Sequence, residues 1–236
     1  MIPDLTVIYY TANLISPYFM ANTQKLLLDA IGDTPVISVS FKPTIVGPNC
    51  QNICIGEQQR SGYMLYKQIM IGVQAAKTKF VATAEDDTIY PREHFEAHIP
   101  DGYLGYNLNK WSIFTWTNPQ IFSKRKGRRT MNTMIGSRDL LAKTLEERYS
   151  KYPVLEEIPP DIIKYYWGEP GRFEDHLGIS KVPNIEFESS IPVVAFSTPE
   201  ALAYLGLGRR KAHDPNQTEE IPYWGKASDI IRIYQP

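Results

Sequence analysis

The chain has 236 residues, with 25 lysines and arginines against 26 aspartates and glutamates, and a formal net charge of -1. Hydrophobic residues make up 43% and charged residues 22%, the composition of a globular protein long enough to bury a full core. No apolar run reaches about 18 residues, the N-terminus lacks the basic region of a signal peptide, and two cysteines cannot form a disulfide scaffold. We therefore expect one compact, soluble, cytoplasmic domain over residues 1–236, without a membrane span.

The first fifty residues predict a strand, a helix, a second strand and a loop. Residues 5–10 are mostly apolar and β-branched or aromatic, as in a buried strand. Ser16 then supplies a helix N-cap, Pro17 fits the first helical position, and Gly32 is a natural C-terminal stop. Residues 35–41 form the second predicted strand, and the Gly-Pro-Asn sequence at 47–49 predicts a loop.

A second predicted helix leads into a third strand at residues 80–84. Residues 61–77 carry Leu65, Ile69 and Val73 at the spacing of one buried helix face. The alternation of strands and helices predicts an α/β fold, a Rossmann-like and mainly parallel sheet flanked by helices. The second half of the chain is less regular, with strands expected at 111–116 and 191–196 and helices at 137–149 and 199–205.

Three adjacent carboxylates, Glu85, Asp86 and Asp87, directly follow the third strand. In an open α/β sheet, ligands bind beyond the carboxyl ends of the strands. Adjacent carboxylates repel one another unless a cation neutralises them, and hard oxygen ligands suit Mg²⁺ or Mn²⁺ bridging to substrate phosphates. The cluster therefore predicts a divalent-metal site, with a solvated acidic turn as the plainer alternative.

The sequence around this cluster resembles a known motif. An apolar strand, then E-D-D, then T-I-Y-P and a short helix is similar to the metal-binding acidic motif of GT-A-fold glycosyltransferases. The segments at 171–176 (GRFEDH) and 211–214 (KAHD) resemble the second acidic motif and the late histidine of the same family, in the same order. The Gln-x-x-Arg-Trp motif of processive synthases is absent, so the resemblance is to non-processive, family-2-like members.

The resemblance implies a nucleotide-sugar donor, expected to be a UDP-sugar, with Mn²⁺ or Mg²⁺ on its diphosphate. It also implies that residues 1–101 bind the donor and residues 102–236 the acceptor. Asp175 would take the proton of the acceptor hydroxyl, with Glu174 as second choice, and the transfer would invert the sugar. The implied metal ligands are Glu85, Asp87 and His213, and the implied donor contacts are Thr11, Ala12, Asn13, Arg60, Glu85, Asp86 and Lys211.

Charge is unevenly distributed along the chain. Residues 102–138 contain seven basic residues and no acidic one, which leaves a balance of -8 for the rest. Basic groups interleaved with aromatic ones suit a nucleic-acid strand, and would suit a hydroxymethylated base in viral DNA as one acceptor. The alternatives are a solvated loop, a lid over the donor diphosphate, and a glycan or small-molecule acceptor. The predicted acceptor residues are Lys124, Arg125, Lys126, Arg128, Arg129 and Trp116.

Two other classes of function stay open. A sugar-phosphate nucleotidyltransferase needs a glycine-rich basic loop after the first strand, where this chain has Thr11-Ala12-Asn13. A non-catalytic module that binds carbohydrate or nucleic acid would not need the acidic motifs and His213 to converge. His94 and His98 are expected on a solvated helix face, because no third metal ligand stands near them.

Overall fold

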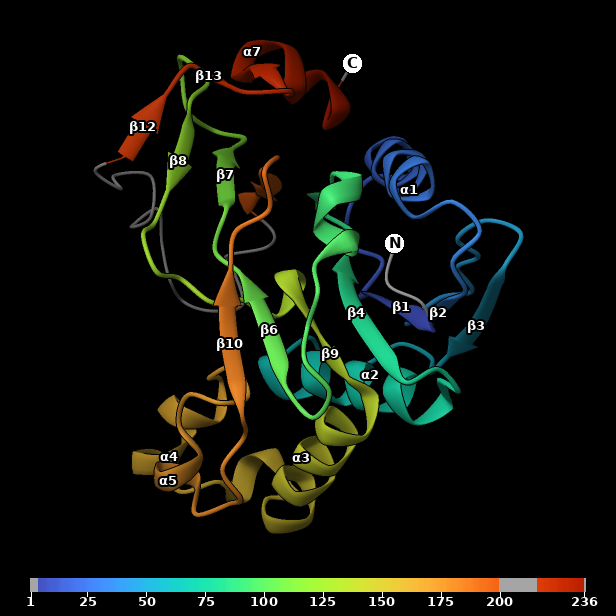
Figure 1. The fold of residues 1–236 in the computed structure, drawn as a ribbon, viewed down its shortest axis with the longest axis vertical. Helices are drawn as coiled ribbons and strands as arrows, with labels where there is room; N and C mark the ends of the chain where they lie inside the picture. Colours follow the sequence, from blue (N-terminus) through green and yellow to red (C-terminus); the bar gives the residue numbers. More distant parts are fainter. Residues whose placement is uncertain (1–3, 200–215, 236) are drawn as a thin grey trace.

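The computed structural model describes residues 4–199 and 216–235 and is built around a seven-stranded sheet (Figure 1). The strands run in the order β10-β6-β9-β4-β1-β2-β3, and only β9 is antiparallel to its neighbours. The predicted α/β fold with a mainly parallel sheet is therefore confirmed, and strands from both halves of the chain share this sheet. The bounds are β1 (Leu5–Thr11), β2 (Val36–Ser40), β3 (Cys50–Cys54), β4 (Phe80–Glu85), β6 (Leu104–Asn107), β9 (Met134–Ser137) and β10 (Asn184–Phe187).

The two predicted N-terminal helices begin at the serines that the sequence marks as caps. The Ser16 hydroxyl accepts a hydrogen bond from the backbone N–H of Phe19 (3.2 Å), and Gly32 ends the helix. The Ser61 hydroxyl accepts in the same way from the backbone N–H of Met64 (3.1 Å). Each cap satisfies an N–H group that the first turn leaves without a partner. The helices are α1 (Pro17–Ile31) and α2 (Gly62–Ala75).

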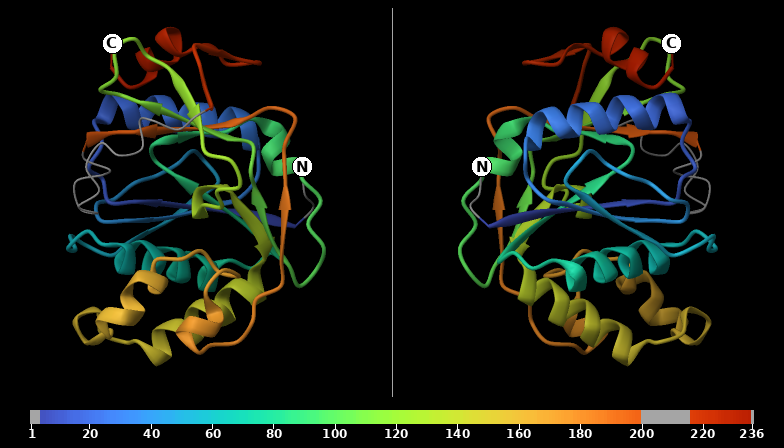
Figure 2. Two further views of the ribbon diagram at one scale, coloured as in Figure 1. Left: turned by 90° about the vertical axis from the view of Figure 1, so that its left-hand side faces the viewer. Right: turned by 90° about the vertical axis from the view of Figure 1, so that its right-hand side faces the viewer.

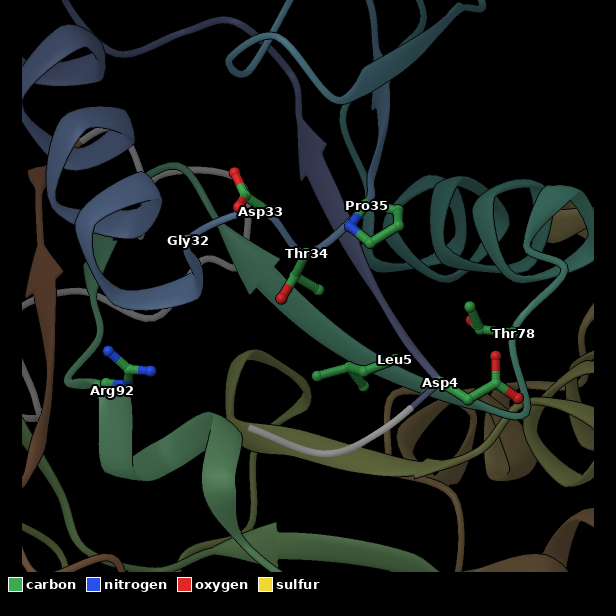
Figure 3. Close-up of a pocket in the computed structure, with 8 residues that line it drawn as sticks. All are labelled: Asp4, Leu5, Gly32, Asp33, Thr34, Pro35, Thr78 and Arg92. Atoms are coloured by element: carbon green, nitrogen blue, oxygen red, sulfur yellow. The ribbon is translucent and has the colours of Figure 1, made fainter.

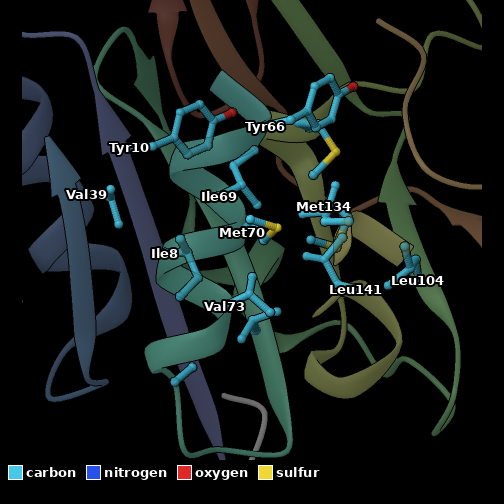
Figure 4. Packing of buried hydrophobic residues seen from close by; sticks show 14 of the residues in the cluster. Ile8, Tyr10, Val39, Tyr66, Ile69, Met70, Val73, Leu104, Met134 and Leu141 are labelled. Atoms are coloured by element: carbon cyan, nitrogen blue, oxygen red, sulfur yellow. The ribbon is translucent and has the colours of Figure 1, made fainter. Parts of the chain in front are cut away.

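The two helices cover opposite faces of the sheet (Figure 2). Successive side chains of β1 point to opposite faces, so Ile8 packs with α2 (Figure 4), whereas Val7 packs on the side of α1. Gly72 of α2 lies so close to β1 that an added Cβ would sit 2.5 Å from Cγ2 of Ile8. Because both faces are covered, all seven residues of β1 are buried, and this strand anchors the site described below.

A second, five-stranded sheet runs in the order β12-β8-β7-β11-β5 and lies beside the carboxyl edge of the first. The backbone N–H of Phe196 donates to the carbonyl of Asp87 (2.8 Å), which ties β11 to the acidic cluster. The predicted strands at 111–116 and 191–196 are confirmed as β7 and β11, whereas the predicted helix at 199–205 lies almost wholly outside the described residues. The bounds are β5 (Thr88–Ile89), β7 (Lys110–Phe114), β8 (Phe122–Lys124), β11 (Val193–Ser197) and β12 (Asn216–Thr218).

The remaining elements are short apart from α3, which packs beside α2. The helix predicted at 137–149 is confirmed, but the Ser137 side chain makes no capping hydrogen bond, because this residue is still paired in β9. No helix within residues 4–199 and 216–235 is long and apolar enough to cross a membrane. The elements are α3 (Arg138–Lys151), α4 (Pro160–Tyr166), α5 (Glu174–Leu177), α7 (Ala227–Ile230), β13 (Glu220–Ile221), β14 (Gly225–Lys226) and 3₁₀ turns at Arg92–Glu96, Met131–Thr133, Leu155–Glu157 and Ile231–Ile233.

The expectation that His94 lies on a solvated helix face is wrong. His94 is fully buried between the rings of Tyr90 and Phe95, whereas His98 is exposed as expected. Asn107 places its amide nitrogen 3.2 Å from Nδ1 of His94, while its oxygen accepts the backbone N–H groups of Asn109 (2.9 Å) and Ser189 (3.2 Å). Nδ1 must therefore accept a hydrogen bond, which holds the imidazole neutral.

We expect His94 to make the protein less stable in mild acid. Burial lowers the pKa of His94 to about 3, against about 6.5 in the unfolded chain, so below pH 6.5 the unfolded state binds the extra proton. This costs about 2 kcal/mol of unfolding free energy between pH 7 and pH 5. Urea unfolding at pH 7 and at pH 5 should show that His94→Gln no longer loses this stability between the two pH values. Exposed His98→Gln should keep it, and equal slopes for all three proteins would contradict the assignment.

Candidate functional site

The acidic cluster lies where β4 ends, next to the end of β1. Glu85 is the last residue of β4 and is in register with Tyr10 of β1. The Tyr10 hydroxyl donates to Oε1 of Glu85 (2.7 Å), and the backbone N–H of Glu85 donates to the Tyr90 hydroxyl (3.0 Å). Two buried tyrosines therefore fix Glu85 at the carboxyl edge of the sheet, where α/β folds bind ligands.

Asp86 is held by the loop that follows β1. Thr11 donates its hydroxyl to Oδ2 of Asp86 and accepts the backbone N–H of Asn13 (2.8 Å). Burial raises the pKa of Asp86 to about 6, although the Thr11 hydrogen bond and the charge of Arg60 both lower it. Thr11, Arg60 and Asp86 were predicted as donor contacts from three separate segments, and the fold brings them together.

Asn13 and Ala12 complete this loop. Asn13 adopts a left-handed backbone conformation (φ 56°), which asparagine tolerates better than most residues. Its side-chain amide donates to Thr44 Oγ1 (2.8 Å), and its side-chain oxygen accepts the backbone N–H of Lys42 (2.8 Å). Asn13 therefore braces the loop against the segment after β2, and Ala12 lies half-buried beside it.

Asp87 is the end of a chain of hydrogen bonds that begins at Lys110. The Lys110 ammonium donates to Oδ1 of Asn132 (3.1 Å), and the amide of Asn132 donates to the Thr88 hydroxyl (3.0 Å). Thr88 in turn donates to Oδ1 of Asp87 (3.1 Å). Because Asn132 and Thr88 are buried, this chain fixes the orientation of the Asp87 carboxyl. Lys110 also donates to Thr130 Oγ1 (3.0 Å).

The raised pKa values of Asp86 and Asp87 indicate that the cluster has too little positive charge around it. Burial, followed by the charges of Glu85 and Asp86, raises the pKa of Asp87 well above its usual range, although Lys110 lowers it. Burial and the nearby charge of Arg128 lower the pKa of Lys110 itself to about 8. A divalent cation would relieve the repulsion among the carboxylates.

The residues present fit such an ion in part. Mg²⁺ and Mn²⁺ commonly use one or two carboxylates together with water and substrate phosphates, and Glu85 and Asp87 supply that number. Within residues 4–199 and 216–235, no three histidine, cysteine or acidic side chains converge as a ligand set. The predicted third ligand, His213, and the predicted donor contact Lys211 lie outside the described residues.

The two acidic residues of the second motif, Glu174 and Asp175, lie in different environments. Glu174 is buried and accepts the backbone N–H of Gly171 (2.6 Å), so it supports the preceding loop. Asp175 is exposed and lies 3.9 Å from Lys181.

The predicted basic segment is largely engaged within the protein. Lys124 lies 3.5 Å from Glu188, and Arg129 forms a 2.7 Å ion pair with Glu186 of β10. Arg125 and Lys126 are exposed, while Arg128 is half-buried and acts on Lys110. The half-buried Trp116 packs edge-on against Phe114 (5.4 Å).

Sequence reasoning missed two residues that the fold brings to this region. Lys110 belongs to the basic stretch and directly precedes the strand predicted at 111–116, and nothing in the sequence indicated that it is half-buried and directed at the acidic cluster. Glu169 lies between the predicted elements of the second half, and its charge acts on Lys110. Neither residue belongs to a motif, so spacing along the chain identifies neither of them.

A separate pocket of about 550 Å³ opens at the amino ends of β1 and β2 (Figure 3). It lies at the edge of the sheet opposite to the acidic cluster. Substrate sites of α/β sheets form at the carboxyl edge, so we do not assign chemistry to this pocket. Its lining residues are Asp4, Leu5, Gly32, Asp33, Thr34, Pro35, Thr78 and Arg92.

Fold and site together define an α/β domain with a half-buried acidic site at the carboxyl edge of a mainly parallel sheet. No protein-family model and no curated protein matches the sequence. Among solved structures, the chain is similar to the glycosyltransferase GlyE of Streptococcus pneumoniae TIGR4, with 9% identity and a TM-score of 0.49 over 78% of this chain and 45% of that chain.

Two further similar structures are a glycosyltransferase involved in glycosylation of the major capsid of PBCV-1 and residues 1–349 of S. aureus TarS in complex with UDP. The first is 10% identical, with a TM-score of 0.47 over 82% of this chain and 93% of that chain. The second is 12% identical, with a TM-score of 0.45 over 84% of this chain and 62% of that chain. The chain spans less than half of the length of the GlyE structure.

Proposed function

We propose that the chain is a metal-dependent glycosyltransferase that transfers a sugar from a nucleoside-diphosphate donor, a UDP-sugar, to an acceptor hydroxyl. The observation that carries this proposal is the cluster Glu85-Asp86-Asp87, held by β1 and β5 at the carboxyl edge of the sheet with raised pKa values for Asp86 and Asp87. A cation and a diphosphate together would satisfy a site of this kind. The order of the sequence motifs supports the same reaction.

The residues of the chain have distinct roles in this proposal. Glu85 and Asp87 would hold Mn²⁺ or Mg²⁺, which when bound supplies positive charge to the departing diphosphate. Arg60 and Lys110 bring further positive charge to the acidic cluster, near Asp86 and Asp87 respectively. Thr11 donates to Asp86 while it accepts the backbone N–H of Asn13, so its hydroxyl links the loop after β1 to the acidic cluster.

Attack by the acceptor on the face opposite to the diphosphate would invert the anomeric centre. Such a reaction needs a proton acceptor near the acceptor hydroxyl, and it does not need a covalent sugar–enzyme intermediate. Anomer analysis of the product by NMR tests this part of the proposal. Retention of the donor configuration would contradict it.

The proposal is tested by incubating the protein with a panel of nucleotide sugars, with and without Mn²⁺ or Mg²⁺. We expect release of the nucleoside diphosphate from one donor, dependent on the metal. Pyrophosphate release from a nucleoside triphosphate and a sugar phosphate would identify a nucleotidyltransferase instead. No turnover of any donor, with or without metal, would contradict the proposal and favour a binding module.

A hydroxymethylated base in DNA is the acceptor that the basic segment favours. Arg125 and Lys126 are exposed beside Gly127, whereas the ion pairs of Lys124 and Arg129 reduce the charge available to phosphates. Replacing both exposed residues with glutamine should weaken DNA binding and reduce the slope of log K against log salt by about 2. Salt-insensitive binding, or none, in the parent protein would leave a glycan or small molecule as the acceptor.

A further inference from the structure

Strand β3 forms one outer edge of the seven-stranded sheet (Figure 1). Within residues 4–199 and 216–235 it pairs with β2 alone, and it is five residues long. The other strands that end the two larger sheets are shorter, with four residues in β10, three in β12 and two in β5. Natural proteins keep edge strands short, charged or covered, because unpaired N–H and C=O groups can pair with another chain.

The sequence of β3 contains none of these safeguards. Its residues, Cys-Gln-Asn-Ile-Cys, include no charge and no proline. The side chains of Gln51 and Cys54 are exposed, so this edge of the sheet is accessible. By contrast, the opposite edge strand β10 carries Glu186, which forms a 2.7 Å ion pair with Arg129. A second strand could therefore add to β3 without burying an ionised side chain of that strand.

The two ends of the β2–β3 ladder show which backbone groups of β3 face outward. The carbonyl of Asn49 accepts from Val36 (3.0 Å), and the N–H of Ile55 donates to Ser40 (2.9 Å). Alternate residues of a paired strand direct both of their backbone groups to the same neighbour, so the odd-numbered residues of β3 face β2. The groups that face away from β2 are the N–H and C=O of Cys50, Asn52 and Cys54.

Asn52 fixes the centre of this edge. Its side-chain amide donates to the hydroxyls of Ser38 (2.8 Å) and Ser40 (2.9 Å), and its side-chain oxygen accepts the backbone N–H of Thr44 (3.3 Å). An edge that is already ordered loses little conformational entropy when another strand binds to it. Ile45, the residue after Thr44, is 62% exposed and adds an apolar side chain to this region.

The three outward-facing residues are placed symmetrically about Asn52, so the edge is complementary to itself. When two β3 strands lie antiparallel about a two-fold axis at Asn52, Cys50 of each copy faces Cys54 of the other. Each facing pair then exchanges both of its backbone hydrogen bonds. Such an isologous contact closes on itself and leaves no further edge at β3.

We propose that the protein forms a two-fold dimer in which two β3 strands pair antiparallel and join the two sheets into one. β1 and β2 separate β3 from β4, which carries the acidic cluster, so the site of each copy stays open. Because the paired strands run in opposite directions, the two sites face opposite sides of the dimer. The proposal does not depend on the proposed function.

Sedimentation equilibrium of the reduced protein tests the proposal, and we expect a species of twice 27.0 kDa. Cys54→Pro removes an outward N–H and leaves the ladder to β2 intact. We expect it to weaken dimerisation at least about 10-fold, because the two-fold axis repeats the loss. Cys54→Ser is the matched control, since serine keeps the N–H, and it should dimerise as the wild type does. Circular dichroism checks that both variants fold.

Amide hydrogen exchange of the wild type gives a measurement that needs no variant. The amides of Cys50, Asn52 and Cys54 should exchange slowly in concentrated protein and rapidly after dilution. Those of Gln51 and Ile53 should stay protected at both concentrations, because they bond to β2. A monomeric wild type would overturn the proposal. So would a folded Cys54→Pro that dimerises as tightly as the wild type, or exchange at the outward amides that does not depend on concentration.

Discussion

Asp87→Asn is expected to abolish metal-dependent turnover and at the same time to raise the melting temperature of the protein. Asparagine keeps the size of the side chain and an oxygen that accepts the Thr88 hydroxyl, but it removes the charge that a divalent ion needs. Loss of an outer partner of a metal ligand commonly costs 10–100-fold in affinity or activity. The loss of a ligand itself should therefore cost at least about 100-fold in turnover.

The stabilisation follows from the direction of the Asp87 pKa. Burial and the charges of Glu85 and Asp86 raise this pKa, so the ionised form at pH 7 destabilises the folded protein. The contribution of Asp87 becomes more favourable as the pH falls from 7 toward the unfolded pKa of about 4, because the folded state binds the proton first. Asparagine has no such dependence, and each kcal/mol gained raises the melting temperature by about 2–4 °C.

Thermal unfolding without metal and donor turnover with metal measure the two effects. Asp101→Asn is the matched control, because Asp101 is exposed and pairs with Lys79 away from the site. The control should leave turnover unchanged. If Asp87→Asn kept its metal-dependent turnover, Asp87 would not be a metal ligand. A lower melting temperature would contradict the electrostatic explanation.

Lys110→Met is expected to weaken metal-dependent donor binding about 10–100-fold with the fold retained. Methionine keeps the apolar stem, but it removes the charge near Asp87 and the donor that orients Asn132. Without this donor, Asn132 is no longer oriented toward Thr88, and Thr88 no longer fixes the Asp87 carboxyl. A loss of the same size in Asn132→Leu would identify the chain as the cause.

The pH dependence of donor binding gives a second test of the role of Lys110. Burial and the charge of Arg128 lower the pKa of Lys110 to about 8, so the ammonium is lost as the pH rises through this value. Donor binding by the wild type should weaken above pH 8, whereas Lys110→Arg should bind up to higher pH because arginine keeps its charge. Lys124→Met, on the neighbouring strand and paired with Glu188, should retain the wild-type profile. Identical profiles for all three proteins would remove Lys110 from the binding site.

The distribution of charge in space differs from its distribution along the chain. The sequence shows a basic segment and an acidic remainder, which favours an anionic polymer as partner. In the fold, Arg129 of that segment pairs with Glu186 in β10, and Lys124 pairs with Glu188 just after β10. Lys110 acts on the acidic cluster through Asp87. Counting charged residues along the sequence therefore overestimates the positive charge that the folded protein exposes.

Local sequence determined the first half of the fold. The caps at Ser16 and Ser61, the stop at Gly32 and the apolar runs of β1 and β4 follow from interactions within a few residues, so the pattern along the chain is sufficient. It also determined that Glu85, Asp86 and Asp87 end a buried strand. β3, β6 and β9 were not predicted, because these short strands depend on pairing with distant partners.

Tertiary structure alone decided which other groups meet the acidic cluster. The chain from Lys110 to Asp87 connects three separate segments, at residues 87–88, 110 and 132, and the side chains that hydrogen-bond to the backbone of residues 166–171 come from positions spread over more than a hundred residues. The sequence motif pointed to Asp175, which the fold exposes, whereas Glu174 beside it is buried and supports the preceding loop. Burial and long-range contacts set the position and protonation of a side chain, and neither can be read from residue spacing.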